Sequence, residues 1–280
     1  MKSKLIMWTA IIFAVAMFFF NQFSKHGFDP SVRHQIEEAL KSPDTARETR
    51  FGKANYVQVM GDKLRITEEQ IQNYLKGLGE KERAGVRFWS RQKRDVVAAS
   101  AFGIDHSHHF VNGYLVGYEP FKTLYLWMPH YTITMRLRYQ LDSKQYGGLK
   151  DVWQTSKQAF HNTRGDCEDH ALILADWLIE MGLDARVVLG VYKKQGHAWI
   201  VVFKDSNVYL LEATAKQKRK HWRHYPLARL EPNYHPKFMF NRDYFWVNTG
   251  TVFTTDYQGK HWVRKSRYVA AEQIGAGGSS

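Results

Sequence analysis

The sequence predicts an α+β fold in which a cysteine opens a helix packed on an antiparallel sheet, preceded by a membrane anchor and a helical segment. Residues 167–181 carry apolar side chains three and four apart, and Gly182 is a natural residue just beyond a helix end. Three β-rich runs follow, at 185–192, 197–203 and 208–214, joined by short polar connections. Short connections favour an antiparallel meander, which we expect to pack on the helix.

The composition indicates a folded protein with a strong positive charge. Of the 280 residues, 44% are hydrophobic and 15% aromatic, which is enough for a packed core. The formal net charge of +13 fits three kinds of partner, namely nucleic acid, an anionic membrane surface or an acidic substrate. The single cysteine excludes an intramolecular disulfide and any zinc site built from several cysteines.

The first residues predict a signal anchor, a single transmembrane helix over residues 1–23. Lys2 and Lys4 precede an apolar run, Leu5 to Phe20, in which only Thr9 is polar. A cleaved signal peptide is the alternative, but bulky aromatic residues directly follow the small residues that signal peptidase requires. The lysines favour an inside position for the short end, so we expect the bulk of the chain on the exported, periplasmic side. That location argues against nucleic acid as a partner.

Residues 29–125 indicate a mainly helical accessory region. Helical spacing of apolar residues appears in 67–78, where Thr67 and Gln70 match the capping-box pattern of a helix start. The segment 83–100 continues in the same style. The sequence leaves open whether this region is a spacer, a lid or an autoinhibitor.

We place the core domain at residues 126–270. Its segment 131–139 alternates apolar and polar residues and predicts a strand. Residues 225–267 are rich in aromatic side chains and predict further strands that close the core. The glycine- and serine-rich residues 271–280 predict a flexible tail.

The predicted helix and meander bring three reactive side chains together. Cys167 opens the helix, where the macrodipole and free N–H groups favour a thiolate and an adjacent oxyanion. A tight hairpin that pairs Phe203 with Val208 sets His197 and Glu212 on one face of the sheet as diagonal neighbours, about 7–8 Å apart at Cα. A cysteine nucleophile needs an imidazole, and a carboxylate can orient that imidazole and stabilise its cation.

Each of these residues also has a purely structural explanation. A lone buried cysteine is usually a small hydrophobic residue, His197 can be a satisfied strand-end residue, and Glu212 can pair with a lysine. Their order in the chain, behind a Gly165-Asp166-Cys167 start, favours a nucleophile, a base and an acid over three unrelated residues.

The stretches "RGDCEDHALILADWLIEMG", "GHAWIVVF" and "VYLLEAT" resemble the transglutaminase-like superfamily, most closely the bacterial transglutaminase-like cysteine proteinases of papain-like fold. The resemblance covers roughly residues 132–214. It implies that Cys167 is the nucleophile, that His197 is the general acid and base, and that Glu212 orients the histidine. The family usually has aspartate at this third position.

The same resemblance suggests further site residues. Relatives place groups that line the oxyanion pocket at the positions of Trp153 and Gln154. Some periplasmic members bind calcium through the acids flanking the cysteine, here Asp166 and Glu168, and adjacent carboxylates with backbone oxygens suit a hard cation. Helix capping is the alternative role for Asp166. The amide chemistry itself requires no cofactor.

Two other segments carry concentrated chemistry. The stretch "DHSHH" at 105–109 holds imidazoles of the kind that bind zinc, but no second ligand cluster accompanies it, and we expect a solvated loop. The basic run "KQKRKHWRH" at 216–224 is either a solvated surface loop or a site that recruits an acidic substrate or anionic lipid.

The combined expectation is a membrane-anchored, exported thiol enzyme that acts on an amide bond of a protein or peptide, with acidic peptides among the candidate substrates. Water is the expected acceptor of the acyl group, which makes the enzyme a cysteine protease or amidase, whereas an amine acceptor would make it a transamidase. The alternative is a non-catalytic transglutaminase-like binding or scaffold protein at the membrane. An idle thiol in an oxidising compartment argues against that alternative.

Overall fold

The computed structural model describes residues 30–41, 50–215 and 225–271. The chain divides into two compact units, residues 1–42 and residues 43–280. The described part of the first unit is helix α2 (Pro30–Ala39). All other elements belong to the second unit.

Several predicted segments fall outside the described residues. These are the anchor at 1–23, the basic run at 216–224 and the tail from residue 272 onward. Within the described ranges, no helix is long and apolar enough to cross a membrane. The anchor therefore stays a prediction.

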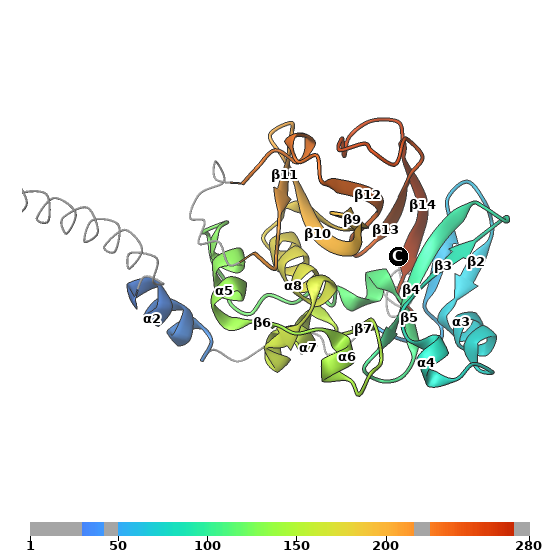
Figure 1. Cartoon of the computed structure of the whole chain (residues 1–280), viewed down its shortest axis with the longest axis horizontal. Helices are drawn as coiled ribbons and strands as arrows, with labels where there is room; N and C mark the ends of the chain where they lie inside the picture. Colours follow the sequence, from blue (N-terminus) through green and yellow to red (C-terminus); the bar gives the residue numbers. More distant parts are fainter. Residues whose placement is uncertain (1–29, 42–49, 216–224, 272–280) are drawn as a thin grey trace, which may run out of the picture. The chain divides into compact units, whose positions relative to one another are not determined.

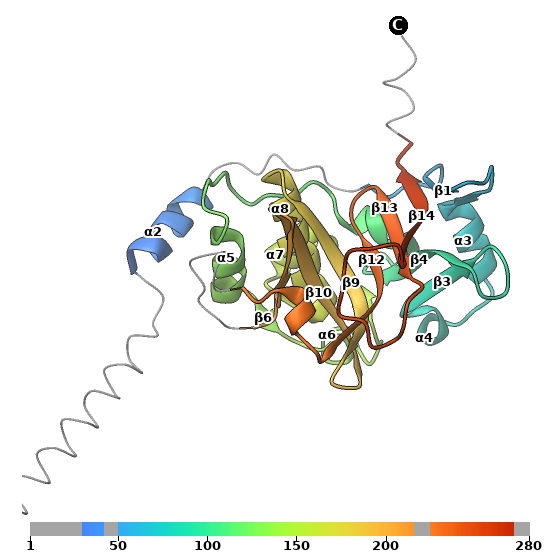
Figure 2. The same ribbon diagram turned by 90° about the horizontal axis from the view of Figure 1, so that it is seen from above.

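The second unit combines short helices with a large antiparallel sheet. Its α-helices are α3 (Glu68–Leu75), α4 (Glu80–Arg83), α5 (Met128–Arg136), α6 (Asp142–Gln145), α7 (Ser156–Asn162) and α8 (Cys167–Glu180). Two 3₁₀ turns accompany them, η1 (Val111–Tyr114) and η3 (Ala228–Leu230). In Figures 1 and 2, α5, α7 and α8 gather at one end of this unit and α3 and α4 at the other.

The main sheet has the strand order β11-β10-β9-β12-β13-β14-β1-β2. Its strands are β1 (Tyr56–Val59), β2 (Arg65–Thr67), β9 (Asp184–Tyr192), β10 (Gln195–Lys204), β11 (Asn207–Leu211), β12 (Tyr234–Phe240), β13 (Tyr244–Asn248) and β14 (Trp262–Val269). A smaller sheet contains β3 (Val86–Ser90), β4 (Val96–Gly103), β5 (His108–Phe110) and β7 (Val152–Trp153). The short strands β6 (Arg138–Tyr139) and β8 (Arg164–Gly165) pair with each other.

Helix α8 is the element that positions the site, and it follows the prediction closely. It packs against β9 and β10, as Figure 1 shows, and against α5 and α7. Leu174 and Leu178 are fully buried in this contact, and each such side chain contributes about 1.5–3 kcal/mol of transfer free energy. Gly182, at φ 82°, ends the helix in the left-handed conformation that glycine adopts without strain. The predicted α+β core is confirmed.

The predicted meander register is confirmed near the turn and differs at the far end. Phe203 pairs with Val208, and the two turn residues between β10 and β11 both have positive φ, as a type I′ hairpin requires. The ladder stops at the pair Ile200–Leu211, so β11 is shorter than expected and Glu212 lies just beyond its end. Glu212 is thereby free of the strand pairing.

The expectation of a mainly helical region at 29–125 is wrong. The capping box at Thr67 is present and starts α3, but the segment 83–100 forms β3 and most of β4. Strand β4 is buried along almost its whole length, so its apolar residues show no one-sided period that would reveal a strand. Nor does a boundary at residue 125 exist, because β1 pairs with β14 and β7 pairs with β4.

Two other local expectations fail because burial hides the period. The predicted strand at 131–139 is mostly helix α5, whose residues 128–134 are all buried, and Pro129 lies in its first turn. The predicted solvated loop at 105–109 contributes β5, in which His108 and His109 are buried. His109 lies between two carboxylates, with Nδ1 at 3.0 Å from Glu68 and Nε2 at 2.8 Å from Asp105.

Candidate active site

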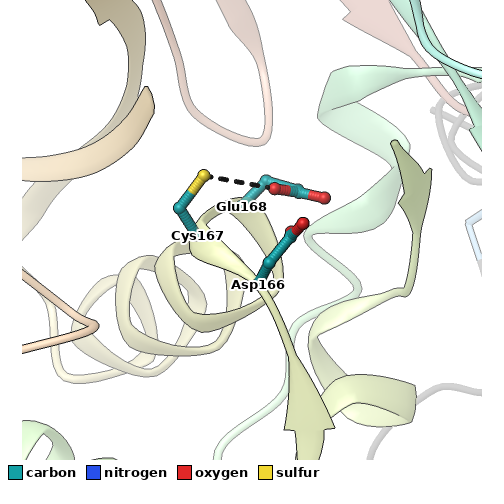
Figure 3. A group of neighbouring side chains, drawn as sticks. All are labelled: Asp166, Cys167 and Glu168. Carbon is teal, nitrogen blue, oxygen red and sulfur yellow. Dashed lines mark hydrogen bonds between the residues drawn. The ribbon is translucent and has the colours of Figure 1, made fainter. Parts of the chain in front are cut away.

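Cys167 lies at the first turn of α8, directly after β8, and is half-buried. The first N–H groups of a helix have no partner within it, and the helix dipole adds positive potential there. Asp166 occupies the N-cap position, but its side chain makes no capping hydrogen bond, so the predicted capping role is not seen. Figure 3 shows the Cys167 thiol donating instead to Oε2 of Glu168, at 3.4 Å.

The Gly-Asp-Cys-Glu-Asp stretch has a steric reason for its glycine. A Cβ atom on Gly165 would collide with the side chain of Asp169 one turn into the helix. The fully buried Asp169 carboxylate accepts hydrogen bonds from the backbone N–H of Gln154 at 2.9 Å and from its Nε2 at 2.6 Å. The start of α8 is thereby attached to the chain after β7. No spacing in the sequence predicts this contact between Asp169 and Gln154.

The histidine and the glutamate meet as predicted. His197, near the start of β10, has its Nε2 at 2.8 Å from Oε2 of Glu212. Tyr234 donates to the same oxygen at 3.0 Å, and Thr214 donates from its backbone N–H and hydroxyl to the other oxygen at 3.1 and 2.6 Å. Burial alone would raise the pKa of Glu212, but the hydrogen bond and charge of His197 outweigh it and lower that pKa. Glu212 therefore stays ionised.

His197 lines the same cleft as the Cys167 thiol. Burial alone would lower the pKa of His197, but hydrogen bonds to Cys167 and to Glu212, with the charges on both, raise it to about 10. Because Glu212 occupies Nε2, Nδ1 is the ring nitrogen left for the sulfur. The structure thus brings Cys167, His197 and Glu212 together, with an imidazolium between two acidic groups at neutral pH. Tyr234, which holds the carboxylate, was not singled out from the sequence.

The two residues expected beside an oxyanion pocket have different placements. Trp153 lines the cleft around Cys167, and its Nε1 donates to Asp151 at 2.7 Å. Gln154 is fully buried and points away, donating from Nε2 to the Arg164 carbonyl and to Asp169. Both amide hydrogens of Gln154 are in use, so its expected place in the pocket is not seen. The free N–H groups at the start of α8 are the oxyanion donors that remain.

The cleft around Cys167 has a volume of about 720 Å³. The start of α8 lines it with Asp166, Cys167 and Glu168, and β9 and β10 contribute residues 189–191 and 196–198. Val86 and Phe88 of β3 and Lys237 and Phe238 of β12 also line it. Residues once expected in a helical accessory region therefore line the site. Their i, i+2 spacing on β3 is the one sequence signal that could have identified them.

Gly190 at the floor of this cleft permits two strands to approach closely. A Cβ atom there would lie 2.6 Å from the indole of Trp199 and even closer to the His235 carbonyl. Gly190 pairs with His197 on one side and with Pro236 on the other. Gly190 therefore allows β10, which carries His197, and β12 to lie close to β9 at the cleft.

A cluster of carboxylates adjoins the cysteine. Asp142, Asp166, Glu168 and Asp169 each offer an oxygen, and these oxygens lie within 4.8 Å of one another. Burial, followed by the charge of Asp166, raises the pKa of Asp142 to about 8. Burial and the neighbouring acids also raise the pKa of Glu168 well above its ordinary value. Oδ1 of Asp142, Oδ1 of Asp166 and Oε1 of Glu168 accept no hydrogen bond within the described structure.

This cluster has the chemistry of a hard-cation site. Close, buried carboxylates repel one another, and a divalent cation with oxygen ligands relieves that repulsion. Asp166 and Glu168 were expected from the sequence, whereas Asp142 was not. Asp142 arrives from α6, distant in the chain, and no pattern in the sequence connects the two segments.

Comparison with known proteins matches the part of the chain that holds these residues. Residues 151–258 match the model of the CEP76 peptidase-like domain. That segment contains Cys167, His197 and Glu212. It is well under half of the chain, and β1 to β5 lie outside it.

The curated relatives share only short stretches. Human protein CC2D2B is 36% identical over 61 residues, which is 22% of this chain and 4% of the relative. Human centrosomal protein of 76 kDa is 40% identical over 57 residues, 20% of this chain and 8% of the relative. The chain thus spans less than a tenth of the length of the curated relatives it matches.

Solved structures show a distant likeness. LapG from Legionella pneumophila is 19% identical, with a TM-score of 0.37, over 46% of this chain and 68% of that one. A calcium-bound form of the same protein is 18% identical, also with a TM-score of 0.37, over 50% and 75% of the two chains.

Proposed function

We propose that this protein is a cysteine protease or amidase that cleaves an amide bond in a protein or peptide. The observation that carries the proposal is His197, which is held by the Glu212 carboxylate and shares an open cleft at a helix start with the Cys167 thiol. The match of the same segment to a peptidase-like domain model supports it. A buried structural cysteine would need neither the imidazolium nor the cleft.

In the proposed reaction the Cys167 sulfur attacks the substrate carbonyl carbon as a thiolate, while the imidazolium of His197 holds its proton. The oxyanion of the tetrahedral intermediate accepts hydrogen bonds from backbone N–H groups at the start of α8. His197 then gives its proton to the leaving nitrogen, the C–N bond breaks, and a thioester remains on Cys167. Water, deprotonated by His197, attacks the thioester and releases the carboxylic acid and the thiol. Glu212 keeps the ring oriented and stabilises its charged form.

We also propose that the carboxylate cluster of Asp142, Asp166, Glu168 and Asp169 binds calcium. The oxygens without hydrogen-bond partners support this assignment, because buried acceptors are normally satisfied. Bound calcium would neutralise the cluster and hold α6 against the start of α8. The thiol donates to Oε2 of Glu168, so Oε1 is the oxygen that remains for a cation.

The test combines two measurements on the full chain. Because Cys167 is the only cysteine, iodoacetamide labelling followed by intact mass reports on that thiol alone. We expect His197→Ala to slow labelling at pH 6 on the order of tenfold, since it removes the imidazolium that stabilises the thiolate. A mixed peptide library should be cut by the wild type and not by Cys167→Ala, and His197→Ala should cut at least about 100-fold more slowly.

Product chemistry separates the acyl acceptors. In ¹⁸O-labelled water a hydrolase adds one labelled oxygen to the new C-terminus, whereas a transamidase forms adducts with added methylamine. The proposal is refuted if His197→Ala leaves the rate of Cys167 labelling unchanged and no peptide is cut in the presence or absence of calcium. A non-catalytic binding role would then be the better explanation.

A further inference from the structure

A β-bulge in β12 lies at the edge of the cleft. Pro236 pairs with Gly190 and Phe238 pairs with Leu189, so neighbouring residues on β9 face residues two apart on β12. Lys237 is the extra, unpaired residue. In a regular strand Lys237 and Phe238 would point to opposite faces, but both line the cleft here. A bulge that redirects a side chain towards a site is a recurrent device.

Lys237 is charged and is not paired with an acid in the described part of the chain. Lys237 is exposed and makes no ion pair or side-chain hydrogen bond with any residue that the structure describes. Among the described residues that line the cleft, it is the one lysine or arginine. It forms no ion pair with Asp151, whose two oxygens accept from Trp153 Nε1 and from the Val86 N–H.

The surface beside Lys237 is apolar. Phe88 of β3 stacks on Phe238 with ring centroids 4.4 Å apart, and Leu189 and Val191 of β9 continue this wall. Phe88 nonetheless leaves 45% of its surface exposed. An aromatic pair half open to water beside a reactive thiol favours an apolar side chain that covers it.

We propose that Lys237, with the Phe88–Phe238 wall, determines substrate specificity by selecting a peptide with an acidic side chain two positions from an apolar one. This inference rests on the proposed protease function and names its substrate class. Lys237 and Phe238 both line the same cleft, so the acidic and apolar side chains they contact lie on one face of an extended peptide, two positions apart. The net charge of +13 draws acidic proteins towards the chain, and Lys237 places one carboxylate at the cleft.

The test is cleavage-site profiling with the full chain and a library of mixed decapeptides, read by mass spectrometry. We expect Asp and Glu to be enriched at one fixed position relative to the cut, with an apolar residue two positions away. Lys237→Glu should reverse that position to Lys and Arg, changing the ratio of acidic to basic cuts about five- to tenfold. Lys63→Glu makes the same charge change on an exposed turn outside the cleft and should leave the profile unaltered.

Two additional readouts test the same assignment. Salt of about 1 M should weaken the acidic preference of the wild type, since the contact is exposed. Phe88→Ala should relax the apolar preference and retain the acidic one.

The outcomes separate this inference from the function on which it rests. Cuts that depend on Cys167 but show no acidic preference, or a preference that Lys237→Glu leaves unchanged, overturn the specificity role alone. Lys237 would then be a solvated bulge residue. A profile that Lys63→Glu shifts equally would assign the effect to net charge and also overturn the role. Both proposals are refuted if the wild type cuts no peptide and His197→Ala leaves the rate of Cys167 labelling unchanged.

Discussion

Replacement of Glu212 by glutamine should lower the pKa of His197 while leaving the shape of the site intact. Glutamine has the size of glutamate but no charge, and its amide can still contact Tyr234 and Thr214. The pKa of His197 is about 10 because contacts with Cys167 and Glu212 outweigh the effect of burial. Loss of the Glu212 charge therefore removes one of the two contributions that keep the ring protonated.

The size of the effect follows from the contact. The His197–Glu212 distance is 2.8 Å and the two side chains are 15% and 19% exposed, so solvent screens the pair only in part. A hydrogen bond between charged groups contributes about 1.5–3 kcal/mol, and one pH unit corresponds to about 1.36 kcal/mol. Glu212→Gln should therefore lower the pKa of His197 by roughly one to two pH units.

The assay is an NMR titration of the imidazole resonances between about pH 5 and 11. The chain contains 13 histidines, so His197→Ala is needed to assign the signal. Thr214→Val is the matched control, because it removes only a hydroxyl contact with the carboxylate and should shift the titration far less. A His197 that is already neutral at pH 7 in the wild type, or a titration that Glu212→Gln leaves unchanged, contradicts the ion pair.

Four other perturbations have defined outcomes. Gly190→Ala should lower the free energy of unfolding by about 1–3 kcal/mol in urea melts, whereas Gly196→Ala, with nothing within 4 Å of its Cβ, should not. The pKa of His109 is raised to about 9 because its two carboxylate contacts outweigh burial. The contribution of His109 to the free energy of unfolding is therefore complete below about pH 6.5 and is lost as the pH rises through 9. His109→Gln should lower the free energy of unfolding by about 3–5 kcal/mol at pH 6 and by much less at pH 10. An equal loss at both pH values would count against a charged His109. Calcium at about 1 mM should raise the melting temperature of the wild type but not of Asp142→Asn, as differential scanning fluorimetry would show. Deletion of residues 1–23 should move the chain from the pelleted membrane fraction to the supernatant, and a deleted chain that still pellets would contradict the anchor.

The parts of the fold that could be predicted are those in which local rules agree. The helix at Cys167 has a clear period and a glycine end, and a two-residue turn sets the register of β10 and β11. These two facts together were enough to bring His197 near Glu212. Because β11 ends at Leu211, Glu212 lies outside the strand, but its partner is still His197.

The parts that could not be predicted depend on burial and on distant contacts. Strand β4 and helix α5 are buried almost all round, so neither shows the amphipathic period on which prediction relies. Asp142 and Phe88 reach the site from segments far from Cys167 in the chain. Side chains that meet only through tertiary packing leave no spacing to recognise.

The pairing of β1 with β14 determines when the fold becomes complete on the ribosome. Tyr56 pairs with Val269, so β1 can pair with β2 early but gains its second neighbour only when the final described strand has been made. Strand β4 pairs with β3, which contains Phe88, and packs on β13 and β14. Its packing is therefore also complete only after β13 and β14 have been made. Contacts of such long sequence separation form slowly. Cys167 and His197 are therefore synthesised before β13 and β14, on which β4 packs, and a nascent chain holds the thiol before the cleft around it is complete.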